Sequence, residues 1–244
     1  MDPFYDRYFP HDTDATVAFY HAVEACLPEA GAILDLGCGD HRALARYRTA
    51  ERQVWGVDLA AHPRLQHAEF FRKVSPTGAI PFPNESFDVV AALWVVEHVA
   101  EPAAFLAEVD RVLKPGGHFV ALTADARHYI TWGSRLLQAL PHAVTQRIVQ
   151  RLYGRPPDDT HPTRFRLNTP AQIDRAAATT GLRRTKLRRF ANPNYLSFFE
   201  PLRRAAIVTD WLLERFVPGW GRIYFVATLE KSAANKANRF TKAA

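Results

Sequence analysis

The segment that most constrains the fold of this chain is residues 32–40, with the sequence AILDLGCGD. Its apolar residues predict a buried strand ending at Leu36, and Gly37 and Gly39 predict a tight turn immediately after it. Glycine lacks a Cβ atom, so the main chain can bend sharply here and a ligand can approach it closely. Acids flank the turn at Asp35 and Asp40. A strand that runs into such a turn is typical of domains that bind a nucleoside-type cofactor.

A second apolar run, residues 53–57, ends in Asp58, about twenty residues beyond the turn. Rossmann-like units place an acid at this point for the ribose hydroxyls of the ligand. The third glycine of the dinucleotide motif G-x-G-x-x-G is absent, because Arg42 occupies its position. This substitution argues against an NAD-dependent oxidoreductase. On these residues alone, an ordinary strand-to-helix turn of an α/β domain is an equally good interpretation.

Three more motifs follow in order: residues 80–90 (IPFPNESFDVV), 94–99 (WVVEHV) and 113–119 (LKPGGHF). Together with the glycine turn, they resemble the class I S-adenosylmethionine-dependent methyltransferases, particularly the small-molecule branch with its "LPF…FD" and "LKPGG" signatures. The resemblance covers residues 30–124 and is loose elsewhere. It implies S-adenosyl-L-methionine as the cofactor.

The resemblance also implies the fold: an α/β, Rossmann-like, mostly parallel seven-stranded sheet with helices on both faces and an antiparallel last strand. We expect one methyltransferase domain over residues 1–230, followed by a disordered tail at 231–244. Within the domain we expect an N-terminal lid or helix (1–30), a cofactor-binding core (31–124), a substrate-recognition insert (125–170), and C-terminal helices and strands (171–230).

The spacing of apolar and turn-forming residues around the motifs predicts helices and strands of ordinary length. The aromatic residues of segment 1–12 predict either a lid over the cofactor or a clamp on the rim of the core, and a helix capped by Asp12 or Thr13 should follow. The crossover between Asp58 and the next strand is too short for a full helix. The expected helices are 13–27, one beginning at Asp40, 103–113, 134–140, 144–153, 171–180 and 202–216, and the expected strands are 69–74, 87–93, 118–123, 182–190 and 222–229.

Cofactor-binding roles follow from matching the family's motifs to this chain. Asp35 would fix the amino-acid end of the cofactor, the glycines would pass beneath the adenosine, and Asp58 would hold the ribose. The family usually places an acid and a small residue before the "LPF" motif to meet the adenine, whereas this chain has Pro76 and Thr77. Thr77 could substitute as a hydrogen-bonding side chain. The cofactor-binding candidates are Asp35, Gly37, Cys38, Gly39, Asp58, Leu59, Thr77, Phe82 and Trp94.

The candidate catalytic residues are His98, His161 and Glu97, in that order of preference as a general base. Ligands of open α/β sheets sit beyond the carboxyl ends of the strands, so Glu97 and His98 should border the reacting methyl group. A structural histidine that pairs with the main chain is an equally good interpretation of His98, and a solvated loop is an equally good one for the segment around His161. Orientation of the reactants alone contributes several kcal/mol, so a base is not strictly required. No spacing of residues predicts a metal site.

The composition predicts a folded protein, since 48% of the residues are hydrophobic and 23% are charged. Two cysteines, Cys26 and Cys38, cannot form a disulfide framework. The first residues lack the pattern of a secretory signal, and the longest apolar run, 89–96, is too short to span a bilayer. We therefore expect a cytoplasmic protein.

We expect transfer of a methyl group to an oxygen or nitrogen of a small molecule, or of a lipid-like or other secondary metabolite. The net charge of +6 permits anionic partners, so an RNA-modifying enzyme is an alternative. Amino-group modifiers of bases, however, carry an Asn/Asp-Pro-Pro-aromatic stretch where residues 93–96 read LWVV. A non-catalytic S-adenosylmethionine-binding protein is a further alternative. Core packing is the better interpretation of the apolar residues in helix 202–216. Together with the apolar residues of the insert and the nearby arginines, they could alternatively form a surface for a lipid or a lipid-linked substrate, and the oligomeric state stays open.

Overall fold

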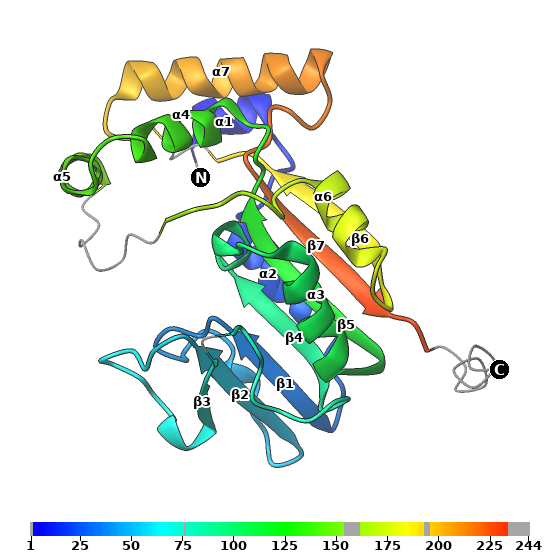
Figure 1. Ribbon diagram of the computed structural model, residues 1–244. Helices are drawn as coiled ribbons and strands as arrows, with labels where there is room; N and C mark the ends of the chain where they lie inside the picture. Colours follow the sequence, from blue (N-terminus) through cyan, green and yellow to red (C-terminus); the bar gives the residue numbers. More distant parts are fainter. Residues whose placement is uncertain (1, 76, 154–161, 193–195, 234–244) are drawn as a thin grey trace.

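A twisted seven-stranded sheet organises the computed structural model, which describes residues 2–75, 77–153, 162–192 and 196–233 (Figure 1). The strand order is β3-β2-β1-β4-β5-β7-β6. The first five strands are mutually parallel, and β7 runs antiparallel to both of its neighbours. The Rossmann-like architecture expected from the motifs is confirmed. The strands are β1 (Gly31–Leu36), β2 (Arg52–Asp58), β3 (Phe71–Lys73), β4 (Phe87–Leu93), β5 (Leu113–Ala124), β6 (Leu182–Phe190) and β7 (Tyr224–Lys231).

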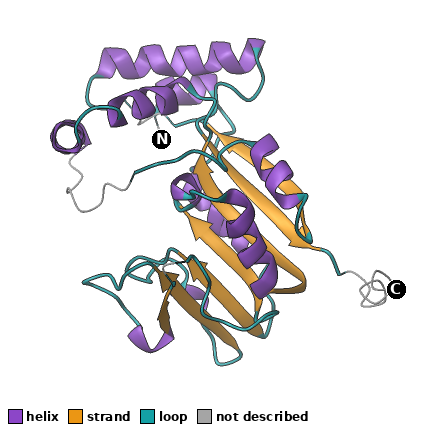
Figure 2. Ribbon diagram, in the orientation of Figure 1, coloured by secondary structure: helices purple, strands orange, loops and turns teal. Residues whose placement is uncertain are grey.

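Helices cover both faces of the sheet (Figure 2). On one face, α3 (Pro102–Val112) and α6 (Pro170–Ala177) pack on a core that includes Leu34 of β1. On the other face, α2 (Ala15–Glu24) packs through Phe19 on Ile33 of the same strand. Alternate residues of β1 therefore serve opposite cores, as the two-residue period of a strand requires. The central strand β4 is buried on both faces, which explains its nearly continuous apolar sequence.

Several predicted element boundaries were wrong. Helix α2 is capped by Asp14, which accepts hydrogen bonds from the amides of Thr16 and Val17, rather than by Asp12 or Thr13. Helix α3 ends at Val112, and β5 already includes the Pro-Gly-Gly sequence that was expected to precede it.

The predicted helix at Asp40 was also wrong, because the chain between β1 and β2 forms only turns and the short 3-10 helix η1 (Ala45–Tyr47). Gly39 and His41 have φ of 52° and 59°, in the left-handed region, which interrupts a right-handed helix. Leu44 and Tyr47 fill the space over the sheet in its place. The crossover from β2 to β3 is abbreviated as expected, with the 3-10 helix η2 (Ala68–Phe70) as its helical part.

Four helices, which we call the helical cap, lie together at one end of the sheet (Figure 1). They are α1 (Pro3–Tyr8), α4 (Tyr129–Gln138), α5 (His142–Tyr153) and α7 (Glu200–Phe216). Helix α4 follows β5, and α7 leads into β7, whose Tyr224 pairs with Ala124 at the end of β5. The cap therefore stands at the carboxyl ends of the parallel strands, where open α/β sheets bind ligands. None of the helices in the described ranges is long and apolar enough to cross a membrane.

Segment 1–12 is joined to α7 by a small separate core. Tyr5 and Phe9 are buried there with Ala191 and Ile207. This packing corresponds to a clamp on the rim of the core. Of the tail expected from residue 231, Lys231 belongs to β7, and residues 234–244 lie outside the described part.

Candidate functional site

The glycine turn after β1 is held to the neighbouring strand by its own main chain. The amides of Gly37 and Cys38 donate to the carbonyl oxygen of Val57 at 2.8 and 3.1 Å. Gly37 has a φ of 73°, and a Cβ atom there would lie 2.3 Å from Cγ2 of Val95. Gly39 differs, because a Cβ atom at that position would have nothing within 4 Å. Packing thus requires glycine at 37, whereas the chain at 39 borders the open space that a ligand needs.

The side chain of Asp58, at the end of β2, is hydrogen-bonded to this turn. Its Oδ2 accepts a hydrogen bond from the amide of Gly39 at 3.0 Å, and its Oδ1 accepts one from the amide of Leu59 at 2.7 Å. Each carboxylate oxygen can accept more than one hydrogen bond. The remaining lone pairs can therefore accept the two hydroxyls of a ribose.

Asp35 is a buried acid with an unsatisfied oxygen. It is 2% exposed, and its Oδ2 has no hydrogen-bond partner among the described residues. Burial raises the pKa of this carboxyl from 3.8 to about 7, against the opposing effect of a hydrogen bond from the main chain of Leu44. A buried carboxylate that lacks a donor is suited to a cationic group such as the ammonium of an amino acid. In the same turn, burial raises the pKa of the Cys38 thiol, so Cys38 is a neutral packing residue there.

The predicted adenine side is built differently from the ribose side. The exposed Thr77 has its hydroxyl 2.7 Å from Oγ of Ser75, which also accepts the amide of Ala79 at 3.0 Å. Phe82 packs edge-on between Trp55 and Phe87, at ring distances of 5.3 and 4.9 Å. Contact of Thr77 or Phe82 with adenine stays a prediction, and Pro76 lies outside the described residues.

At the carboxyl end of β4, Trp94 turns the chain sharply. Its φ is 60°, an uncommon value for a bulky residue. Its amide donates to Leu122 at 3.1 Å, and its ring stands edge-on to Tyr224 at 4.7 Å. Such backbone strain is concentrated at functional sites in proteins, and it starts the segment that carries Glu97 and His98.

Glu97 is buried and joins three parts of the chain. The hydroxyl of Thr123 donates to its Oε2 at 2.8 Å, and Nδ2 of Asn168 donates to that hydroxyl at 2.7 Å. The carbonyl oxygen of Glu97 accepts the amides of Arg164 and Phe165 at 2.6 and 3.1 Å. These contacts fasten the end of the insert over β5.

His98 anchors the same returning segment. Its Nδ1 lies 2.9 Å from the carbonyl oxygen of Pro162. A carbonyl oxygen only accepts hydrogen bonds, so Nδ1 carries the proton in this contact. Catalytic and structural histidines both make such contacts, so the contact does not distinguish the two roles. His161 lies outside the described residues. The structure thus brings Glu97 and His98 to the edge of the sheet, and their roles as bases stay predictions.

Sequence reasoning missed two buried histidines. His41 is fully buried beside the turn, and neither of its ring nitrogens has a partner among the described residues. A Cβ atom at Gly56 would lie 2.8 Å from His41, so this glycine makes room for the ring. Sequence reasoning missed His41 because it predicted a helix from Asp40, and in a helix this side chain would not be expected to point into the space beside the turn.

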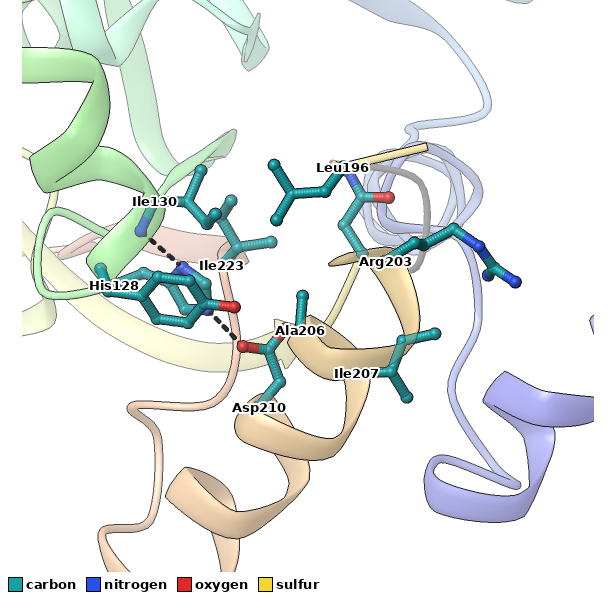
Figure 3. Close-up of a pocket in the computed structure, with 10 residues that line it drawn as sticks. His128, Ile130, Leu196, Arg203, Ala206, Ile207, Asp210 and Ile223 are labelled. Carbon is teal, nitrogen blue, oxygen red and sulfur yellow. Dashed lines mark hydrogen bonds and ion pairs between the residues drawn. The ribbon is translucent and has the colours of Figure 1, made fainter. Parts of the chain in front are cut away.

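The second missed residue is His128, at the start of α4. Its Nε2 lies 3.1 Å from Oδ1 of Asp210 on α7, and its Nδ1 accepts the amide of Ile130 at 3.3 Å. Figure 3 shows this pair at a cavity beneath the helical cap, with Arg203 directed away from it. The cavity has room for about one water molecule. The pair spans 82 residues of sequence, so no local motif could have revealed it.

The sheet order and the glycine turn with its fixed acid define a Rossmann-like nucleoside-binding protein. Residues 34–121 match the model of a methyltransferase domain family. A probable S-adenosylmethionine-dependent methyltransferase of Mycolicibacterium smegmatis is 33% identical over 97 residues, which are 38% of this chain and 38% of that protein. A ubiquinone biosynthesis O-methyltransferase of Bradyrhizobium is 35% identical over 101 residues, covering 38% of this chain and 40% of that one.

Among solved structures, geranyl diphosphate C-methyltransferase from Streptomyces coelicolor has a similar fold. The TM-score is 0.56 at 18% identity, over 88% of this chain and 80% of that chain. Residues 34–121 therefore match a methyltransferase domain family, and the chain shares the fold of a solved S-adenosylmethionine-dependent methyltransferase. It spans about two fifths of the length of the curated relatives it matches.

Proposed function

We propose that this protein transfers a methyl group from S-adenosyl-L-methionine to an oxygen or nitrogen of a small molecule or of a lipid-like or other secondary metabolite. The observation that carries the proposal is Asp58, held by two main-chain amides beside an open glycine turn. When bound there, the cofactor supplies an activated methyl group, so the protein must chiefly orient the acceptor and exclude water.

Different residues of the chain bind the cofactor and orient the acceptor. Asp58 holds the ribose, and the main chain at Gly37 and Gly39 lies against the nucleoside. Asp35 provides the carboxylate for the amino-acid end. The acceptor lies between the end of β4 and the helical cap, where His98, His161 or Glu97 removes a proton when the acceptor is a hydroxyl or an amine.

Calorimetric titration with S-adenosylmethionine tests the cofactor site. We expect Gly37→Arg to abolish binding, because even a Cβ atom at that position meets Val95. Asp58→Ala should weaken binding at least about tenfold, since it removes a carboxylate that accepts hydrogen bonds. Gly133→Ala, on exposed α4 with open space around it, is the matched control and should bind normally. Unchanged affinity in both site variants would refute the assignment.

Methyl transfer itself is tested by radiolabelled cofactor on a broad acceptor panel. The name of one matched protein, a ubiquinone biosynthesis O-methyltransferase, supports an acceptor of the proposed kind. The partners we propose are such an acceptor and, through residues 125–170 and α7, a lipid surface, with the protein in the cytoplasm. Cofactor binding without any turnover would instead favour a non-catalytic binding protein.

A further inference from the structure

Helix α7 has two opposite faces of unusual character. Its inner face carries Ile207 and Asp210, which are buried against the rest of the molecule. Its outer face consists of positions 202, 205, 209, 212 and 216, spaced three and four residues apart as one side of a helix requires. These residues are Leu, Ala, Thr, Leu and Phe, and all are exposed. One exposed stripe of α7 is therefore largely apolar, whereas the exposed side of an ordinary surface helix is polar.

Helix α4 adds a second apolar stripe. Trp132 and Leu136 of α4, and Leu140 just beyond its end, are exposed at intervals of four residues. Leu136 is 76% exposed, as much as Phe216 of α7. The ring of Trp132 lies 6.5 Å from that of Trp220, in the segment that follows α7. This contact joins α4 to the segment after α7, and both helices belong to the helical cap at one end of the molecule (Figure 1).

The charges around these stripes are almost all positive. Residues 129–153, which form α4 and α5, contain Arg135, Arg147 and Arg151 and no acid. The acids of α7 face inward or are neutralised: Glu200 pairs with Arg203 and Arg204, and Asp210 with His128. Glu214 lies 3.4 Å from Arg222. Exposed Arg215 flanks the apolar face of α7.

Apolar residues bordered by arginines on one side of the molecule match the chemistry of an anionic lipid surface, in which apolar side chains enter the interface and cations meet the head groups. A second copy of the chain fits less well, because its arginines would face these arginines. We propose that the helical cap docks on anionic membranes through the exposed faces of α7 and α4. This docking rests on the lipid-surface contact of the proposed function and names its chemistry, but it does not depend on methyl transfer.

Co-sedimentation with vesicles tests the docking in the absence of cofactor. We expect the full chain to bind phosphatidylcholine vesicles that contain phosphatidylglycerol, to bind pure phosphatidylcholine vesicles more weakly, and to lose affinity as salt increases. Wild-type protein that ignores anionic vesicles at low salt would overturn the proposal.

Three variants separate the contributions. The double variant Leu212→Asp/Phe216→Asp should lower the partition coefficient at least about tenfold, because it removes two apolar anchors. Arg135→Gln/Arg215→Gln, which removes one exposed arginine from each docking helix, should reduce the dependence on anionic lipid and on salt. Val17→Asp is the matched control: Val17 is 46% exposed on α2, outside the cap, and an acid is tolerated near a helix N-terminus. It should bind like wild type.

Two outcomes would contradict the proposal even if vesicles bind. Equal binding by the Leu212/Phe216 variant and wild type would show that another surface is responsible. A wild-type dimer in light scattering that the same variant converts to a monomer would assign the face to self-association. The cofactor titration of the variants is independent, so loss of docking and loss of the cofactor site are distinguishable.

Discussion

At the scale of single residues, burial controls the chemistry of Asp35. Its pKa is raised from 3.8 to about 7, so the folded protein holds this proton more tightly than the unfolded chain does. The contribution of this proton to the free energy of unfolding is therefore present in full below about pH 4, and it is lost as the pH rises toward 7. Above that range the buried charge destabilises the fold, by as much as about 4 kcal/mol.

Asp35→Asn should remove this pH dependence while keeping the shape of the side chain. We expect the variant to gain free energy of unfolding relative to wild type as the pH rises from 4 to 8. Denaturant titrations at several pH values measure the difference. A constant difference across the range would show that Asp35 does not titrate in it.

Other single residues show the limits of local reasoning. The glycines and Asp58 were foreseeable, because the chemistry of a turn and the position of an acid after a strand are local properties. The hydrogen-bond partners of Glu97 were not foreseeable, because Thr123 belongs to β5 and Asn168 to the end of the insert. Their meeting depends on how the insert returns over the sheet.

At the scale of elements, one carboxylate connects α1 with the ends of two strands. Asp12 accepts hydrogen bonds from the Tyr5 hydroxyl at 2.8 Å, from the Ala191 amide at 2.9 Å and from Arg222 at 2.7 Å. Its side chain is 9% exposed. This use of Asp12 explains why α2 is capped by Asp14 instead.

Asp12→Ala should therefore destabilise the protein by about 3–5 kcal/mol, because it leaves the Tyr5 hydroxyl and the Ala191 amide without their acceptor and removes one of the two carboxylates beside Arg222. Asp14→Ala, two residues away, removes only a helix cap and should cost about 1 kcal/mol. Thermal unfolding of both variants measures the difference. Similar losses would mean that α1 contributes little to the fold.

Elements were predictable where one physical signal dominated. Strands β4 and β6 occupy the predicted ranges 87–93 and 182–190, because each begins directly after turn residues, Asn84 and Ser86 before β4 and Gly181 before β6. The helix at Asp40 was wrong because a typical crossover was assumed, whereas left-handed residues and buried Leu44 and Tyr47 replace it here. Propensity alone does not reveal such a replacement.

At the scale of the whole molecule, cofactor binding should stabilise the domain as a unit, since the site joins β1, β2 and β4. S-adenosylhomocysteine at about 100 times its dissociation constant should add about 2.7 kcal/mol. For a chain of this size, that corresponds to a rise of about 5–10 °C in the unfolding temperature. NAD should produce no shift, because Arg42 stands where a dinucleotide site needs its third glycine. A shift with NAD alone would contradict the cofactor assignment.

The sequence by itself determined the fold class, the glycine turn and the acid at the end of β2. These depend on periodicity and turn chemistry, which act between residues close in the chain. Only the tertiary structure decided which groups share a site and which are left exposed. Asp210 reaches His128 from α7, and the apolar side of α7 faces outward, because His128 and the N-terminal segment occupy its other face. Burial is a property of the assembled molecule, so the raised pKa of Asp35 and the apolar surface of the helical cap become apparent only there.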